Sequence, residues 1–193
     1  MNQMKKEEYL DVKIINQRNE QLKKQHKSIE TGCYINGTIV EFEEKEALDS
    51  IFLMMPSEFT LMPDELVKIK YPFDFRPLCV LTNDELTVNF NFNEFRTDYE
   101  EKTMKQLTEM VKETLEIESD TFDFGEIKEL SKIDGYYFDF RQNVIDGKLY
   151  HMVANFKLNQ QVYQFTFNCL LSAYSDWKQA VLQVWSSTKY KEM

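Results

Sequence analysis

The sequence lacks the common motifs of catalysis and nucleotide binding. Its five glycines are scattered and form neither a G-x-G-x-x-G pattern nor a P-loop, so nucleotide binding is poorly supported. No G-x-S-x-G segment is present, which argues against a serine hydrolase with that motif. The three cysteines, Cys33, Cys79 and Cys169, form no C-x-x-C pair and no cluster with histidine. We therefore expect reduced thiols, with no disulfide, metal or cofactor.

Histidine is equally scarce, since His26 and His151 are the only two in the chain. Acidic residues are dense between Asp98 and Glu126, but their spacing matches no EF-hand loop, and a solvated helix face with its flanking loop explains them. No set of residues is identified as catalytic. The sequence therefore predicts a protein that is not an enzyme.

Charge limits the choice of partner. The net charge is −10, but residues 1–30 carry seven Lys or Arg and five Asp or Glu, so this segment holds +2 and the remainder −12. A body of that sign repels phosphate backbones and anionic lipids, and we expect no nucleic-acid or membrane partner. No apolar run approaches the length of a spanning helix or a secretory leader, so the expected location is cytoplasmic.

The composition favours a folded protein with one main domain. Of 193 residues, 42% are hydrophobic and 14% aromatic, which is enough to bury a sizeable core. Residues 1–30 are rich in Lys, Gln, Glu and Asn, and we expect a charged extension that is either helical or mobile. Residues 33–190 show no internal repeat, and residues 31–193 are predicted to form a single α+β domain.

Several elements can be placed from local patterns. Asn36-Gly37 between two short apolar runs predicts a hairpin with a type I′ turn, and Pro63 opens a short helix. Thr97 and Glu100 form a capping-box pattern that starts a predicted helix from about 98 to 117. Alternating apolar residues between 133 and 170 predict an antiparallel meander, and an amphipathic helix follows it.

The two faces of this meander differ in polarity. One face is predicted to be core and collects Tyr136, Phe138, Phe140, Tyr150, Met152, Ala154, Phe156, Tyr163, Phe165, Phe167 and Cys169. The opposite face is predicted to hold any ligand or partner site and collects Tyr137, Asp139, Arg141, His151, Asn155, Gln164 and Asn168. Thr87, Asn89 and Asn91 join this polar face if their strand is a neighbour. An antiparallel sheet can leave such a face wet or lightly covered.

Two interpretations of His151 remain open. Asp139 and Arg141 would share its face in this register, and a carboxylate there could orient or charge the imidazole. The alternative is a histidine that belongs to a polar network without chemistry. A thiol dyad of His151 with Cys33 or Cys169 is disfavoured, because Cys169 has the parity of the apolar face and a buried thiol is a poor nucleophile.

The order of elements resembles the PsbP-like fold that DcrB-type bacterial proteins share with the Ran-binding Mog proteins. The residues that carry this resemblance are Met55-Pro56-Ser57-Glu58-Phe59, Met62-Pro63-Asp64-Glu65, Tyr71-Pro72, Thr82-Asn83-Asp84, Leu86-Thr87-Val88-Asn89-Phe90, Ser175-Asp176-Trp177 and Val184-Trp185-Ser186-Ser187. The resemblance implies a three-layer α/β/α sandwich whose mainly antiparallel, twisted sheet has about six to seven strands. It also implies a bacterial protein that acts by binding other proteins, and no family-wide catalytic residues.

Two functions follow as hypotheses. The first is a non-enzymatic protein-interaction module, an adaptor or a chaperone-like protein associated with secretion, whose partner is another protein. The alternative is a small-ligand binder or hydrolase with a polar site around His151. An enclosed pocket lined by His151 would favour a ligand, whereas an open apolar groove would favour a polypeptide. The sequence does not indicate an oligomeric state.

Overall fold

The computed structural model describes residues 2–72, 76–95, 103–118, 121–144 and 147–191. The helices are α1 (Asn2–Gln25), α2 (Asp64–Lys70), α3 (Met104–Glu118) and α4 (Tyr174–Ser186), with a 3-10 turn, η1 (Leu171–Ala173), before α4. The strands are β1 (Lys27–Ser28), β2 (Gly32–Ile35), β3 (Thr38–Val40), β4 (Phe42–Leu48), β5 (Ile51–Pro56), β6 (Thr60–Leu61), β7 (Cys79–Thr82), β8 (Asn89–Phe95), β9 (Phe122–Phe124), β10 (Lys128–Glu129), β11 (Gly135–Val144), β12 (Gly147–Leu158), β13 (Gln161–Leu170) and β14 (Lys189–Tyr190). No helix within these ranges is both long enough and apolar enough to cross a lipid bilayer.

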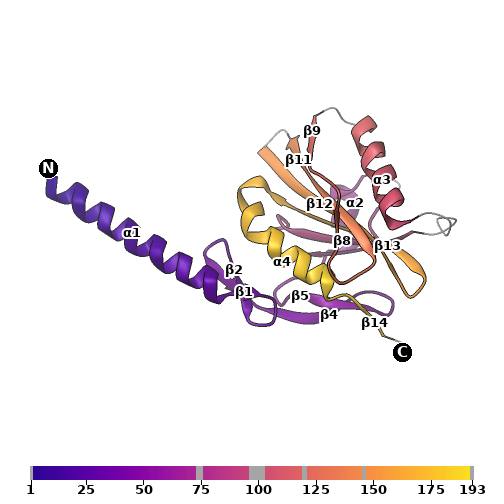
Figure 1. The fold of residues 1–193 in the computed structure, drawn as a ribbon, viewed down its shortest axis with the longest axis horizontal. Helices are drawn as coiled ribbons and strands as arrows, with labels where there is room; N and C mark the ends of the chain where they lie inside the picture. The colour runs from indigo at the N-terminus through magenta and orange to yellow at the C-terminus, as the bar shows by residue number, and fades with distance from the viewer. Residues whose placement is uncertain (1, 73–75, 96–102, 119–120, 145–146, 192–193) are drawn as a thin grey trace.

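A large antiparallel sheet forms the middle layer of the molecule. Its strand order is β10-β11-β12-β13-β8-β7-β6, and β9 pairs with β11 as an eighth strand. Helix α4 and the small sheet β14-β5-β4 lie on one face, and α3 lies on the other (Figure 1). The predicted α+β sandwich is confirmed, with one strand more than the largest number expected.

Local sequence explains why the smaller elements form where they do. Asn36 and Gly37 both have positive φ, and Ile35 pairs with Thr38, so the predicted type I′ hairpin is confirmed. Helix α3 has a reciprocal cap. The Thr103 hydroxyl accepts from the backbone N–H of Gln106, and Oε1 of Gln106 accepts from the backbone N–H of Thr103. The predicted cap at Thr97 and Glu100 lies outside the described residues.

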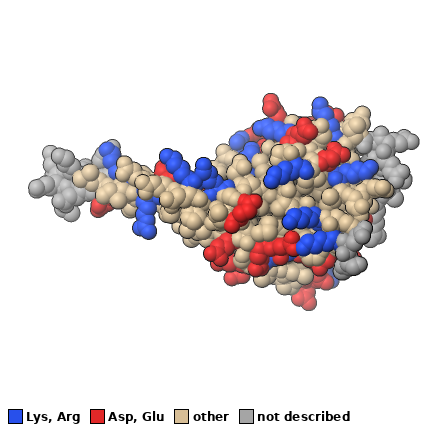
Figure 2. Space-filling model, turned by 60° about the horizontal axis from the view of Figure 1, so that its bottom comes forward, with Lys and Arg blue, Asp and Glu red and all other residues tan. Residues whose placement is uncertain are grey.

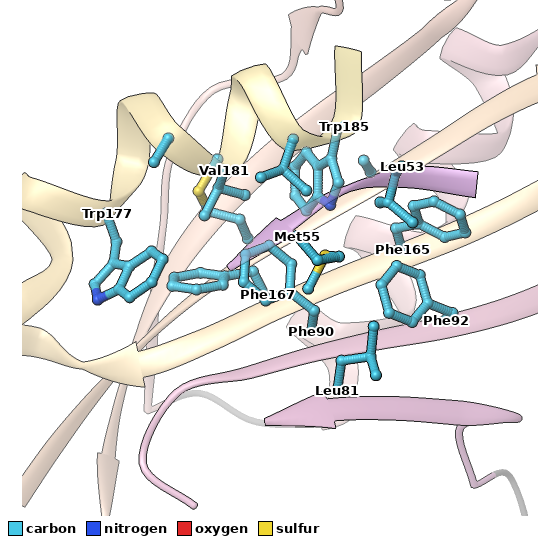
Figure 3. Packing of buried hydrophobic residues seen from close by; sticks show 14 of the residues in the cluster. Leu53, Met55, Leu81, Phe90, Phe92, Phe165, Phe167, Trp177, Val181 and Trp185 are labelled. Atoms are coloured by element: carbon cyan, nitrogen blue, oxygen red, sulfur yellow. The ribbon is translucent and has the colours of Figure 1, made fainter. Parts of the chain in front are cut away.

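The main core lies between the large sheet and α4. Trp177, Val181 and Trp185 of α4 pack over Leu53 and Met55 of β5 and over four phenylalanines of β8 and β13 (Figure 3). These four are Phe90, Phe92, Phe165 and Phe167, and all of them are fully buried. Trp177 and Trp185 are both buried and anchor α4 in this core.

A smaller apolar cluster lies on the other face of the sheet, under α3. Phe138, Phe140 and Val153 are buried there, and Val111 and Leu115 of α3 pack against them. Rings of β9 and β11 extend this cluster, since the Phe122 and Phe140 centroids lie 5.0 Å apart. Both faces of β11 are therefore covered by other elements.

The N-terminal segment forms α1, which extends away from the body of the molecule (Figure 1). Both Lys or Arg and Asp or Glu side chains are visible along this helix, as they are on the body (Figure 2). The helix is joined to the body by Lys23, which pairs with Asp176 of α4, and by Asn19, which accepts a hydrogen bond from Tyr34. The division into an extension, 1–30, and a domain, 31–193, stays a prediction.

One predicted register is wrong. Val144 of β11 pairs with Gly147 of β12, so even-numbered residues of β11 lie beside odd-numbered residues of β12. Phe140 is therefore opposite His151, and Asp139 is opposite Met152. The predicted alternation within β11 is correct. Its apolar residues lie on both covered faces, so polarity alone does not show which face packs against α4 and which against α3.

Candidate functional site

A row of uncharged polar side chains crosses three strands of the large sheet on the side of α3. The register aligns His151 with Asn168 and Asn89, and it aligns Thr166 with Asn91. Gln164 of β13 pairs with Asn155 of β12 on the same side of the sheet. The predicted neighbourhood of β8 is confirmed for Asn89 and Asn91, so the polar face continues from β12 to β8.

Hydrogen bonds hold the Asn and Thr side chains of this row in fixed orientations. Asn89 Nδ2 donates to Asn168 Oδ1 at 2.8 Å, and Asn91 Nδ2 donates to Thr166 Oγ1 at 2.9 Å. The Tyr71 hydroxyl, which follows α2, donates to Asn91 Oδ1 at 2.8 Å. A network in which each member has a partner rigidifies a polar surface that is partly closed off from water.

The same network continues under α3. Gln164 Nε2 donates to Asn155 Oδ1 at 3.1 Å, and Asn155 Nδ2 donates to Thr108 Oγ1 at 3.2 Å. Both Asn155 and Thr108 are fully buried. These bonds position the carboxamide of Gln164 from a region that solvent does not reach.

A cavity of about 470 Å³ lies between α3 and this polar row. Its volume falls within the range of roughly 300 to 1,000 Å³ that is typical of small-molecule sites. The polar residues that line it are Tyr71, Asn91, Thr114, His151, Gln164, Thr166 and Asn168. The apolar residues that line it are Phe95, Val111, Leu115, Phe140 and Val153.

His151 lines the cavity as a neutral imidazole. Its ring stacks on Phe140, with centroids 4.6 Å apart and planes at 3°. Burial lowers its pKa from 6.5 to about 4. The Nε2 atom is buried and has no hydrogen-bond partner among the described residues, so a second proton on the ring would have no acceptor at that position.

Three residues that were predicted to share the face of His151 lie on the opposite face instead. Tyr137 is buried against Trp185 of α4. Asp139 accepts hydrogen bonds from Tyr150 and from Lys178 of α4. Their predicted grouping with His151 is wrong, because the pairing of Val144 with Gly147 places Asp139 opposite Met152.

Arg141 is the third of these residues, and the same register places it on the opposite face from His151. Its guanidinium pairs with Asp123 of β9 at 2.7 Å on the surface. A charge relay from Asp139 or Arg141 to His151 is therefore not formed. For Asp139, burial alone would raise the pKa, but the hydrogen bonds from Lys178 and Tyr150 outweigh it and lower the pKa. The carboxylate thus joins α4 to the sheet rather than serving the cavity.

The cysteines do not contribute to this site. Cys169 lies opposite Tyr150 on the α4 side of the sheet, and burial raises its thiol pKa to about 12. Burial similarly raises the pKa of Cys33 to about 11. In the described part of the chain, no group of three or more His, Cys, Asp and Glu side chains could hold a metal ion.

Four of the seven predicted site residues do lie together on one face, namely His151, Asn155, Gln164 and Asn168. Sequence reasoning missed the contribution of α3 and of Tyr71 to the cavity. Val111 and Leu115 are four residues apart and therefore share one face of a helix, but this spacing gives no information about which side of the sheet that face covers.

Comparison with known proteins identifies the type of fold. No protein family model and no curated protein matches the sequence. Among solved structures, cyanobacterial PsbP (CyanoP) from Synechocystis sp. PCC 6803 superposes with a TM-score of 0.54 and 12% identity, over 81% of this chain and 96% of that one. The chain has the PsbP-like fold.

Two further structures show weaker likeness. A protein from Bacteroides thetaiotaomicron gives a TM-score of 0.49 at 13% identity, over 74% of this chain and 46% of that one, so the chain spans less than half of its length. LpqN of Mycobacterium tuberculosis, described as involved in cell envelope biogenesis, gives 0.47 at 11% identity, over 86% and 98%. The assignment of the PsbP-like fold rests on the superposition with CyanoP, and the fold carries no specific function with it.

Proposed function

We propose that this protein is a non-enzymatic binding module that takes up a small molecule in the cavity between α3 and the polar row of the sheet. The observation that carries the proposal is the cavity itself, about 470 Å³ in volume, with His151 in its wall. Small-molecule sites typically combine apolar walls with a few fixed polar groups. Here Val111, Leu115 and Phe140 supply the former, and the hydrogen-bonded row supplies the latter.

The chemistry of the lining favours binding over catalysis. The twelve described residues that line the cavity include no carboxylate, amine or thiol. His151 is the only titratable base among them, and no carboxylate lies beside it to orient the ring or to stabilise an imidazolium. General acid and base catalysis commonly depends on such a pairing.

A fragment screen by NMR tests this proposal. We expect members of a mixed library of neutral, anionic and cationic fragments to shift the side-chain amide signals of Asn91, Gln164 and Asn168 in the full chain. Val111→Trp should abolish these shifts, because the larger ring occupies the cavity. The matched control is Ile117→Trp on the same helix, whose side chain is 87% exposed and does not line the cavity. A library in which no fragment affects these signals would refute the proposal.

Association with another protein is a second candidate, supported by α1. Leu10, Val12, Ile14 and Ile15 of this helix are each about half exposed. Exposed apolar side chains on a projecting helix offer a surface for a helical partner. The adaptor, chaperone-like and secretion-associated roles, and the cytoplasmic location, belong to this candidate as proposals.

This second candidate is tested with a chain in which Leu10 and Ile14 are changed to Ser. Cross-linked purification from the native cell should recover a defined partner with the original chain and lose it with the variant. Equal recovery with both chains would place any association elsewhere. The cavity shifts should be the same in both chains, so the two candidate functions are tested separately.

A further inference from the structure

The cavity has a uniform electrical character. None of its twelve described lining residues carries a charge, and its one histidine is neutral. Transferring an ion from water into such a site without a counter-charge is unfavourable, because the ion loses part of its hydration. An uncharged ligand avoids that cost.

The polar row also offers a specific pair of hydrogen-bonding groups. Thr166 Oγ1 already accepts from Asn91, so the hydroxyl proton of Thr166 remains to be donated elsewhere. Gln164 uses one amide N–H to reach Asn155, so its carbonyl oxygen and its second amide N–H remain to be offered to a ligand. The two residues are separated by one position on β13 and therefore point to the same face.

The opposite wall has no comparable polarity. Val111 and Leu115 of α3 line the cavity with apolar atoms, and Thr114 beside them donates its hydroxyl to the backbone of Met110. A ligand in this space therefore meets hydrogen-bonding groups on the side of the sheet and hydrocarbon on the side of the helix.

From these observations we infer that the ligand is an uncharged molecule with one edge that carries both a hydrogen-bond acceptor and a donor, as a primary amide does, and with an apolar remainder. The acceptor receives the Thr166 hydroxyl, and the donor reaches the Gln164 carbonyl oxygen. This inference rests on the proposed function, because it assigns a chemical class to the occupant of the same cavity.

The test compares three compounds of nearly equal shape: benzamide, benzoate and benzamidinium. Each is titrated into the full chain, and the side-chain amide signals of Gln164, Asn91 and Asn168 are followed. We expect benzamide to bind roughly tenfold more tightly than either ion, since burial of an unpaired charge opposes the other two. Equal or tighter binding of either ion would overturn the inference while leaving the cavity as a binding site.

A second test introduces a positive charge at the cavity wall and compares it with the same charge placed elsewhere on α3. Thr114→Lys places a cation at the cavity wall on an exposed position of α3, and it should move the preference from benzamide towards benzoate by at least about threefold. Ile117→Lys adds the same charge to the same helix away from the cavity and should leave the preference unchanged. An identical preference in the original chain and both variants would contradict the inference.

The failure of the inference can be distinguished from failure of the proposed function. If none of the three compounds affects the signals while other fragments of the mixed library do, the chemical class is wrong and the binding function stands. If no library fragment affects them either, the binding function itself fails.

Discussion

Replacing His151 with Phe should reduce the sensitivity of this protein to mild acid. The folded state holds the imidazole with a pKa of about 4, compared with 6.5 for an unburied histidine. A group whose pKa is depressed on folding takes up its proton more readily in the unfolded chain. Stability from this source is therefore intact above pH 6.5 and falls as the pH decreases from 6.5 towards 4.

The size of the effect follows from the two pKa values. Linkage gives a loss of about 2 kcal/mol between pH 8 and pH 5, and of about 3 kcal/mol by pH 4. A domain of this size is typically stable by only about 5 to 15 kcal/mol. His151 alone should thus remove a substantial part of the stability in weak acid.

Urea denaturation of the original chain and of His151→Phe, measured at several values between pH 8 and pH 4.5, checks this. Between pH 8 and pH 5 the free energy of unfolding of the original chain should fall by about 2 kcal/mol relative to that of His151→Phe. Phe keeps an aromatic ring beside Phe140, and groups such as Asp139 titrate in both chains, so their effects cancel in the difference. A constant difference across this range would refute the reasoning.

NMR gives an independent measurement of the same pKa. The chain has only two histidines, so His26→Gln leaves the ring signals of His151 as the only ones to follow. We expect them to remain those of the neutral form down to about pH 5. Titration with a midpoint near 6.5 would contradict the buried, unprotonated ring.

Three other changes test how the fold is held together, each by urea denaturation. Tyr150→Phe removes the 2.7 Å hydrogen bond to Asp139 and should cost about 1.5 to 3 kcal/mol, but much less in an Asp139→Asn background. Thr103→Ala should cost about 1 kcal/mol by removing the cap of α3, whereas Thr103→Ser should retain most of it. Trp185→Ala should cost about 3 to 5 kcal/mol because this side chain is fully buried, and Trp185→Phe should cost less. A loss below about 1 kcal/mol for Trp185→Ala would show that the core between α4 and the sheet relaxes around the gap.

The parts of the fold that were predictable are those set by neighbouring residues. Asn36-Gly37 requires positive φ at two positions, and Pro63 fixes the start of a helix, so each specifies its own local structure. The alternation in β12 and β13 was also sufficient, because their turn pairs Leu158 with Gln161 and the Tyr and Phe residues of both strands lie in the core on the α4 side. These relations involve few residues and short separations.

The site was less predictable because it depends on which elements cover which face. His151, Gln164 and Asn168 were expected on one face and line the cavity together. Val111 and Tyr71 complete it from α3 and from the segment after α2, and neither position follows from a local pattern. Their contribution is fixed by packing across the sheet, where sequence separation is large.

The misassignment of β11 has a physical explanation that also accounts for the cavity. On β11 the α3 side is apolar, with Phe138 and Phe140 beneath the helix, whereas on β13 the same side carries Gln164, Thr166 and Asn168. Val111 and Leu115 of α3 pack over the apolar part, whereas Thr108 of the same helix meets the polar network through its hydrogen bond with Asn155. The helix contacts β11 and β12, and the space beyond them towards β8 becomes a cavity with one apolar wall and one polar wall. The change in polarity across a single face of the sheet thus explains why the register could not be derived from the sequence, and it gives rise to the cavity that we propose as the binding site.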